Sequence, residues 1–295
     1  MKKLPFTGSA TAMVTPFLPD GSVNYDKLGQ LIEFQISSGT DAIVVLGTSG
    51  ENATLNDNER REIIRFSVEC VRSRVPVIAG TGSNDTKHAV ALSRFAFGAG
   101  ADALLCVTPY YNKASQEGLI THFYSIADSV QIPVILYNVP SRTGISIGID
   151  AYKELCRHEN ITATKEASGD ISFIAKVAAE CGNELHIYSG NDDQTVPILA
   201  LGGNGVISVL SNIMPKEMHE ICKLWARGSI HEAAALHIKL MDIMDALFMD
   251  VNPIPVKAAM NLMGLEVGGY RLPLCEMPAG KLERLRAAME AVSLI

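Results

Sequence analysis

The chain has 295 residues, of which 47% are hydrophobic and 19% charged, and this composition excludes disorder over most of its length. Its 25 Lys and Arg residues against 32 Asp and Glu residues give a net charge of -7, which excludes the broad basic surface that nucleic acid binding needs. A site for small anions must therefore supply its own local cations or backbone N–H groups.

Eight short apolar runs, each followed by a polar turn and an amphipathic stretch, repeat along the chain and predict eight strand–helix units. The predicted strands are Ala10–Val14, Ala42–Leu46, Val77–Ala79, Ala103–Val107, Val134–Tyr137, Ile161–Thr164, Leu185–Tyr188 and Gly205–Ser208. Helical periodicity is clear over Leu55–Val71 and Thr86–Phe97.

Strands that alternate with helices form a parallel sheet, and eight such units close a (β/α)8 barrel, or TIM barrel. The chain carries neither a G-x-G-x-x-G fingerprint nor a P-loop, which are typical of doubly wound nucleotide-binding sheets. After about residue 228 the pattern is helical. We therefore expect an α/β fold with a barrel catalytic domain over residues 1–228 and a C-terminal helical domain over residues 229–295.

The second predicted strand ends in a turn that is suited to an anion. In barrels of this type the active site lies at the C-terminal ends of the strands. Here the residues are Gly47-Thr48-Ser49-Gly50-Glu51, whose hydroxyls and N–H groups are suited to hold a carboxylate or a phosphate. An ordinary glycine-rich turn is the alternative.

The fourth and fifth strands are followed by aromatic and basic residues. Tyr110 and Tyr111 lie in a proline-containing loop, where surface or interface aromatics are common. Tyr137 ends the fifth strand, and Arg142 lies on the loop after it. Arg142 is either a surface cation or a guanidinium fork for a substrate carboxylate.

Lys165 directly follows the sixth predicted strand. Burial lowers the pKa of a lysine because it disfavours the charged form, which makes a neutral amine available to attack a carbonyl group. Lys165 is therefore a Schiff-base candidate. The alternatives are a side chain that reaches the barrel rim or pairs with Glu166. Tyr137 on the neighbouring strand favours the Schiff base, because a phenol close to the amine can transfer protons.

The last two strands indicate the floor of a small pocket. Gly190 follows the seventh strand, and a glycine-rich segment leads into the eighth. Asp192 and Asp193 are expected to cap a helix and to lie in its first turn. The seven histidines are scattered without a metal-binding pattern, so no metal is expected.

The cysteines and the N-terminal residues indicate a cytoplasmic protein. The six cysteines form no C-x-x-C pair, which favours a reducing compartment. Pro5, Gly8 and Pro16 interrupt any signal-peptide core, and no 18 apolar residues run together, so no membrane partner is expected.

The sequence resembles the dihydrodipicolinate synthase/N-acetylneuraminate lyase family of pyruvate-dependent (β/α)8 lyases and aldolases. The likeness runs from residues 8–16, GSATAMVTP, to residues 252–257, NPIPVK. Residues 137–143, YNVPSRT, resemble the synthase branch, because the sialic acid lyases lack the arginine at that place. The appended helices fit the C-terminal domain of the family.

The resemblance implies roles for the residues around the lysine. Lys165 would form the Schiff base with pyruvate, and Tyr137 would shuttle protons to it. Thr48 and Tyr111 would extend a proton relay, with Tyr111 reaching across a dimer interface into the site of the partner.

The resemblance also implies where the two substrates bind. The turn at Ser49 would hold the pyruvate carboxylate, with Ile207 and Gly190 shaping its pocket. Arg142 would receive the carboxylate of L-aspartate 4-semialdehyde. The implied enzyme is a Schiff-base-forming carbon–oxygen lyase that produces 4-hydroxy-tetrahydrodipicolinate, the first committed step of diaminopimelate and lysine biosynthesis. It would need no cofactor and would be a homotetramer, a dimer of dimers.

The sequence departs from the family pattern where lysine-inhibited members bind their inhibitor. His88 stands where those members carry a glutamate, and Asp57 and Arg60 stand where some carry histidines. Ser49 replaces the usual threonine and keeps the hydroxyl. We therefore predict weak or absent inhibition by lysine.

Three other functions remain open at this point. A sugar-acid aldolase, such as an N-acetylneuraminate lyase, would use the same iminium on another aldehyde. A barrel glycosidase would pair Glu51 with Glu166 as its two carboxylates. A non-catalytic binding protein would keep Arg142 and would tolerate a Lys165→Arg substitution.

Overall fold

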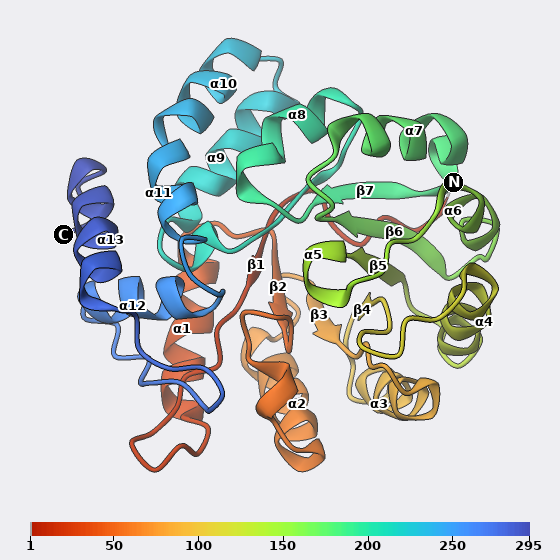
Figure 1. Ribbon diagram of the computed structural model, residues 1–295, viewed down its shortest axis with the longest axis horizontal. Coiled ribbons are helices and arrows are strands. Elements are labelled where there is room, and N and C mark those ends of the chain that lie inside the picture. Colours follow the sequence, from red (N-terminus) through yellow and green to blue (C-terminus); the bar gives the residue numbers. More distant parts are fainter. Residues whose placement is uncertain (1) are drawn as a thin grey trace.

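The computed structural model describes residues 2–295 and contains a closed barrel of eight parallel strands in the order β1 to β8 (Figure 1). The strands are β1 Gly8–Ala12, β2 Ala42–Val45, β3 Val77–Gly80, β4 Ala103–Val107, β5 Val134–Asn138, β6 Ile161–Glu166, β7 His186–Ser189 and β8 Gly205–Ser208. The (β/α)8 barrel expected from the eight apolar runs is therefore confirmed.

Two strand ends differ from the prediction. β1 begins and ends two residues earlier than the apolar run Ala10–Val14. β6 continues through Glu166, so Lys165 lies within the strand instead of after it. The apolar pattern predicted an earlier end because the polar side chains at 165 and 166 interrupt it, although the backbone ladder continues opposite β5 and β7.

Helices surround the barrel in the expected alternation. The α-helices that follow the strands are α1 Tyr25–Ser37, α2 Asp57–Val71, α3 Thr86–Gly98, α4 Gln116–Ala127, α5 Pro140–Thr143, α6 Ile149–Leu155, α7 Ile171–Cys181, α8 Thr195–Ala200 and α9 Pro215–Ala226. Short 3-10 turns are η1 Asn52–Thr54, η2 Gly182–Glu184, η3 Asp192–Gln194 and η4 Leu210–Asn212. No helix within residues 2–295 has the length and apolar character needed to cross a lipid bilayer.

The barrel interior is filled by a small apolar cluster of inward-facing strand residues. Ile78, Ile135 and Ile207 are fully buried there among several alanines. Phe6 stacks on Tyr188 with the ring centroids 4.2 Å apart. A cavity lies at the C-terminal ends of the strands, where active sites of such barrels are found.

Four helices follow the barrel: α10 Ile230–Lys239, α11 Met241–Ala246, α12 Ile254–Leu262 and α13 Ala279–Ala291. α10 packs against α9, and α13 packs against α11 and α12; the four helices after the barrel are blue in Figure 1. The boundary expected at residues 228 and 229 falls in the turn between α9 and α10. The division into two domains at that point stays a prediction.

Candidate active site

Lys165 and Tyr137 lie opposite each other in the paired strands β6 and β5. Side chains alternate along a strand, so both point into the barrel with Ala163 and Ile135, two residues before them. The Lys165 Nζ atom lies 4.6 Å from the centroid of the Tyr137 ring. Lys165 is 5% exposed and Tyr137 is 7% exposed. A nearly buried amine thus lies in contact with a phenol, as the Schiff-base interpretation requires.

Gly190 allows β7 to approach this lysine closely. A Cβ atom at position 190 would lie 3.1 Å from Cε of Lys165 and 2.7 Å from Cβ of Ala167. Any larger side chain would collide with Ala167 and press against the end of the Lys165 side chain. The predicted site residue at 190 therefore lies directly beside Lys165.

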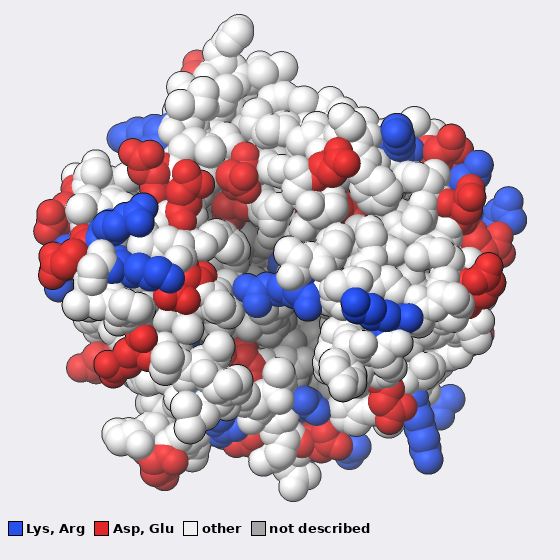
Figure 2. All heavy atoms as spheres, in the orientation of Figure 1, with Lys and Arg blue, Asp and Glu red and all other residues white. Residues whose placement is uncertain are grey.

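Two adjoining cavities open above the lysine. The inner one, of about 150 Å³, is lined by six of the predicted site residues: Thr48, Ser49, Tyr137, Arg142, Lys165 and Gly190. The outer one, of about 430 Å³, shares Thr48, Tyr137 and Arg142 with it. Figure 2 shows a hollow in the middle of this face with basic side chains at its edge. The local cation that an acidic protein needs for small anions is thus present.

The Thr48–Ser49 turn has an unusual backbone at both ends. Leu46 has φ 59° and Glu51 has φ 53°, in the left-handed region that residues with side chains rarely adopt. Within the turn, the Gly50 N–H donates to the Gly47 carbonyl at 3.1 Å. Strained conformations of this kind persist where surrounding contacts hold them, and they are common at binding sites.

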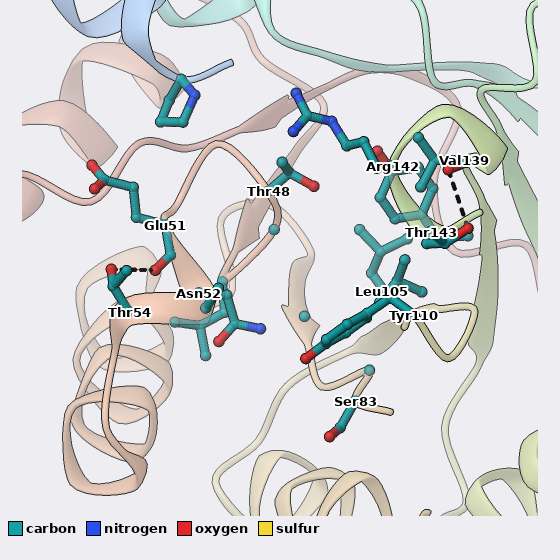
Figure 3. Close-up of a pocket in the computed structure, with 18 of the residues that line it drawn as sticks. Thr48, Glu51, Asn52, Thr54, Ser83, Leu105, Tyr110, Val139, Arg142 and Thr143 are labelled. Carbon is teal, nitrogen blue, oxygen red and sulfur yellow. Dashed lines mark hydrogen bonds between the residues drawn. The ribbon is translucent and has the colours of Figure 1, made fainter. Parts of the chain in front are cut away.

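Asn252 of the C-terminal segment connects both predicted carboxylate sites. Its side-chain amide nitrogen donates to the Ser49 hydroxyl at 3.1 Å. Its backbone carbonyl accepts from the Arg142 guanidinium at 3.3 Å. Figure 3 shows Arg142 extending across the cavity toward Thr48. Sequence reasoning assigned Asn252 no role. The only signal was its place at the start of the NPIPVK stretch at 252–257.

Two predicted site residues lie apart from the cavities. Ile207 is fully buried in the barrel interior, and Val209, two residues later, lines the inner cavity. Tyr111 is 90% exposed, with φ 71°, on the loop after β4. Within this chain the neighbouring Tyr110 lines the outer cavity instead.

Glu166 points to the other side of β6, between the barrel and α6. Its carboxylate accepts hydrogen bonds from Tyr152 at 2.5 Å and from Asn138 at 2.8 Å. Burial raises the pKa of Glu166 above its ordinary value, although these hydrogen bonds oppose the shift. Glu166 therefore neither pairs with Lys165 nor faces the cavities, and Glu51 is bonded to Lys257. The glycosidase alternative thus lacks its two facing carboxylates.

Asp192 differs from its expected role as a cap of its own helix. Its carboxylate accepts from the backbone N–H groups of Val209 at 3.0 Å and Leu210 at 2.9 Å, at the end of β8. Asn191, not Asp192, precedes the 3-10 turn η3. Asp192 therefore fixes the loop after β8, because the fold brings that loop beside it.

Comparison with known proteins identifies the family. The sequence profile of the Dihydrodipicolinate synthetase family matches residues 5–292. Two curated relatives named 4-hydroxy-tetrahydrodipicolinate synthase, from Clostridium novyi and Acetivibrio thermocellus, are 50% and 52% identical to this chain. These alignments cover 97% and 100% of this chain and 96% and 100% of the relatives.

A solved structure agrees with these sequence matches. It is the chloride-inhibited dihydrodipicolinate synthase from Acinetobacter baumannii, complexed with pyruvate. It matches this fold with a TM-score of 0.96 at 41% identity, and the match covers 98% of this chain and 99% of that one. A profile match over nearly the whole length, relatives at half identity and a shared barrel show that the chain belongs to the dihydrodipicolinate synthetase family.

Proposed function

We propose that the protein condenses pyruvate with L-aspartate 4-semialdehyde and releases 4-hydroxy-tetrahydrodipicolinate, the product named in the curated names of its relatives. The observation that carries the proposal is the position of Lys165. Its side chain is nearly buried, it lies in contact with Tyr137, and it lines a cavity that also contains Ser49 and Arg142. A single amine in such a place is suited to covalent catalysis on a small keto acid.

The first half of the reaction joins pyruvate to the enzyme. The neutral Lys165 amine attacks the keto carbon, and the resulting carbinolamine loses its hydroxyl group as water to give an iminium. The Tyr137 hydroxyl donates the proton that leaves with the water. The pyruvate carboxylate lies in the Thr48–Ser49 turn, where hydroxyl and N–H groups donate to it.

The second half forms the new carbon–carbon bond. The iminium withdraws electrons, so a proton leaves the methyl group and an enamine forms. The enamine carbon attacks the aldehyde carbon, and the aldehyde oxygen takes a proton to become a hydroxyl group. The substrate amine then attacks the iminium carbon, closes a six-membered ring and expels the Lys165 amine. Arg142 holds the carboxylate of the aldehyde substrate.

Borohydride trapping tests this mechanism. Borohydride reduces an iminium to a stable amine, so treatment with pyruvate and borohydride is expected to add the reduced pyruvyl mass to the peptide that contains Lys165. An unmodified Lys165 in a fully active enzyme would overturn the mechanism. Turnover with L-aspartate 4-semialdehyde but not with N-acetylneuraminate is expected, and the reverse preference would favour the sugar-acid aldolase.

The proposal extends to the assembly and the compartment. Tyr111 would enter the site of a partner subunit and continue the relay from Tyr137 and Thr48, in a homotetramer built from two dimers. Its exposure in the single chain supports this, because an aromatic side chain 90% exposed is free to be covered by a neighbour. The six free cysteines support a cytoplasmic location.

A further inference from the structure

A second lysine, Lys257 in α12, is buried more deeply than Lys165, and the mechanism does not use it. Its side chain is 0% exposed. The Nζ atom donates to Glu51 Oε1 at 2.8 Å, to the Thr15 carbonyl at 3.1 Å and to the Gly269 carbonyl. An ammonium has three N–H bonds, and each has an acceptor here. Lys257 is therefore a fully satisfied cation inside the protein.

Aromatic rings complete the surroundings of this cation. Its Nζ atom lies 4.3 Å from the centroid of the Phe17 ring and 5.4 Å from that of Tyr270. Both distances are within the range of cation–π attraction. Burial lowers the pKa of Lys257, and the Glu51 carboxylate opposes that shift. The contacts around Lys257 therefore support its charged form.

The partner of this lysine, Glu51, ends the turn that the proposed function assigns to the pyruvate carboxylate. Its backbone N–H donates to the Thr48 carbonyl at 3.1 Å. The Glu51 carboxylate points away from the cavity (Figure 3). Its other oxygen, Oε2, accepts a hydrogen bond from the backbone N–H of Arg271 at 3.1 Å. Glu51 is thus fixed at both carboxylate oxygens by residues of the C-terminal segment.

The same lysine also connects the segment after β1 to this turn. The Thr15 carbonyl accepts from Lys257, and the Thr15 hydroxyl donates to the Gly50 carbonyl at 2.6 Å. Lys257 therefore joins three parts of the chain: the segment after β1, the turn after β2 and the loop at Gly269. One buried side chain thus bonds the turn and two segments beside it.

We propose that Lys257 and Glu51 are positioning residues that hold the Thr48–Ser49 turn in the geometry that binds the pyruvate carboxylate. Neither residue needs to touch the substrate. A buried ion pair adds little net stability over an apolar pair of similar volume, so its main contribution here is geometric. The inference rests on the proposed function, because it explains how that pyruvate site is held in place.

The test measures pyruvate binding through the trapped Schiff base. Wild type, E51Q and the double variant E51Q/K257M are titrated with pyruvate in the presence of borohydride, and the labelled fraction of Lys165 is read by mass spectrometry. We expect the half-saturating pyruvate concentration to rise about tenfold in the double variant, because small displacements of a binding group weaken its interaction strongly. The maximal labelled fraction is expected to match that of the wild type.

The choice of variants keeps the test informative. K257M alone would leave a buried carboxylate without its partner, which destabilises a fold strongly, whereas the double variant removes both charges. E51Q is the milder change. The glutamine carbonyl oxygen still accepts from Lys257, but the glutamine NH₂ group replaces the oxygen that accepts from the Arg271 backbone and cannot accept a hydrogen bond itself. It is expected to raise the half-saturating concentration several-fold. K281M is the control, since Lys281 pairs with Asp250 at 2.8 Å in the same segment.

The outcomes separate this proposal from the proposed function. A half-saturating concentration equal to that of the wild type in both E51Q and the double variant would overturn the positioning role. A lower maximal label without a change in half-saturation would also overturn it, because that is the signature of a smaller folded fraction. If the wild type itself is not labelled at Lys165, the proposed function fails instead.

Discussion

Tyr137 of β5 and Lys165 of β6 lie opposite each other in the sheet, and the Lys165 amine lies 4.6 Å from the centroid of the Tyr137 ring. Tyr137→Phe keeps the ring and removes only the hydroxyl. We expect kcat to fall about 10²- to 10⁴-fold, which is typical for the loss of a general acid–base. Trapping at Lys165 by borohydride should still occur, but more slowly. An unchanged kcat would show that Tyr137 takes no part in proton transfer.

In the proposed mechanism Arg142 contacts only one of the two substrates, so its replacement should affect them differently. One of its N–H groups donates to the Asn252 backbone carbonyl at 3.3 Å, and within residues 2–295 its other N–H groups have no hydrogen-bond partner and can donate to a carboxylate. Arg142→Ala is expected to raise the KM for the semialdehyde about 10- to 100-fold, the loss of a charge-assisted hydrogen bond. The KM for pyruvate should change little. Arg157→Ala, at an exposed pair with Glu154, is the control. Equal effects on both substrates would contradict this assignment.

Tyr111 can be tested by mixing two inactive variants. If Tyr111 acts in the site of a partner, Lys165→Ala and Tyr111→Phe damage the same site from different chains. Mixed dimers would then contain one site with both residues intact. We expect each variant to have low activity and the refolded mixture to regain activity. If the mixture stays as inactive as its parts, Tyr111 acts within its own chain or not at all.

The sequence predicted the barrel well because each unit carries its own signal. Apolar runs and helical periodicity are local, and β4 and β8 begin and end at the predicted residues. Residues at or near the predicted strand ends were then candidates for lining a common cavity, since the closed barrel brings all strand ends to one mouth. This reasoning located Thr48, Tyr137 and Lys165 at the cavity.

The contacts that hold the site could not be predicted in this way. The sequence places a carboxylate, Glu51, in the turn after β2, but its partner Lys257 lies 206 residues later in the chain. Asn252 likewise bonds Ser49 from 203 residues away. No periodicity connects such pairs, because the packing of α12 and the segment before it against the barrel mouth brings them together. Ion pairs and amide contacts of this kind follow from tertiary structure.

Lysine is expected to inhibit weakly or not at all. Asp57 already accepts hydrogen bonds from His88 at 2.9 Å and from Arg60 at 3.0 Å. The hydrogen bond from His88 holds the pKa of Asp57 below its ordinary value. An incoming lysine amine would meet two basic side chains, and the one carboxylate among these three residues already accepts hydrogen bonds from both of them. Steady-state rates should therefore be unaffected at about 1 mM lysine, a concentration that would reveal a binding free energy near -4 kcal/mol.

Introducing a carboxylate provides the matching test of this site. His88→Glu would supply a counter-charge for the lysine amine, so we expect the concentration for half-maximal inhibition to fall. His231→Glu, at an exposed position on α10, is the control. Inhibition of the wild-type enzyme by sub-millimolar lysine would contradict the prediction directly.

Acid should destabilise the fold through His122 of α4. The side chain is 4% exposed, and its Nε2 has no hydrogen-bond partner in the part of the chain that the structure describes. Burial lowers the pKa of His122 from 6.5 to about 4, and Asp85 opposes the shift only weakly. Between these values the unfolded chain binds a proton that the folded chain does not. The stability from neutral His122 is therefore complete above pH 6.5 and is lost as the pH falls toward 4.

His122→Gln removes this titration while keeping a polar side chain of similar reach. We expect the free energy of unfolding in urea to fall less steeply for the variant than for the wild type between pH 6.5 and pH 4.5. The difference over the full interval corresponds to about 3 kcal/mol. His231→Gln, which changes an exposed histidine, should leave the slope unchanged. Parallel pH profiles for wild type and His122→Gln would contradict this prediction. His122 would then become protonated in the folded state without a loss of stability, which requires a partner for its Nε2 that forms on acidification.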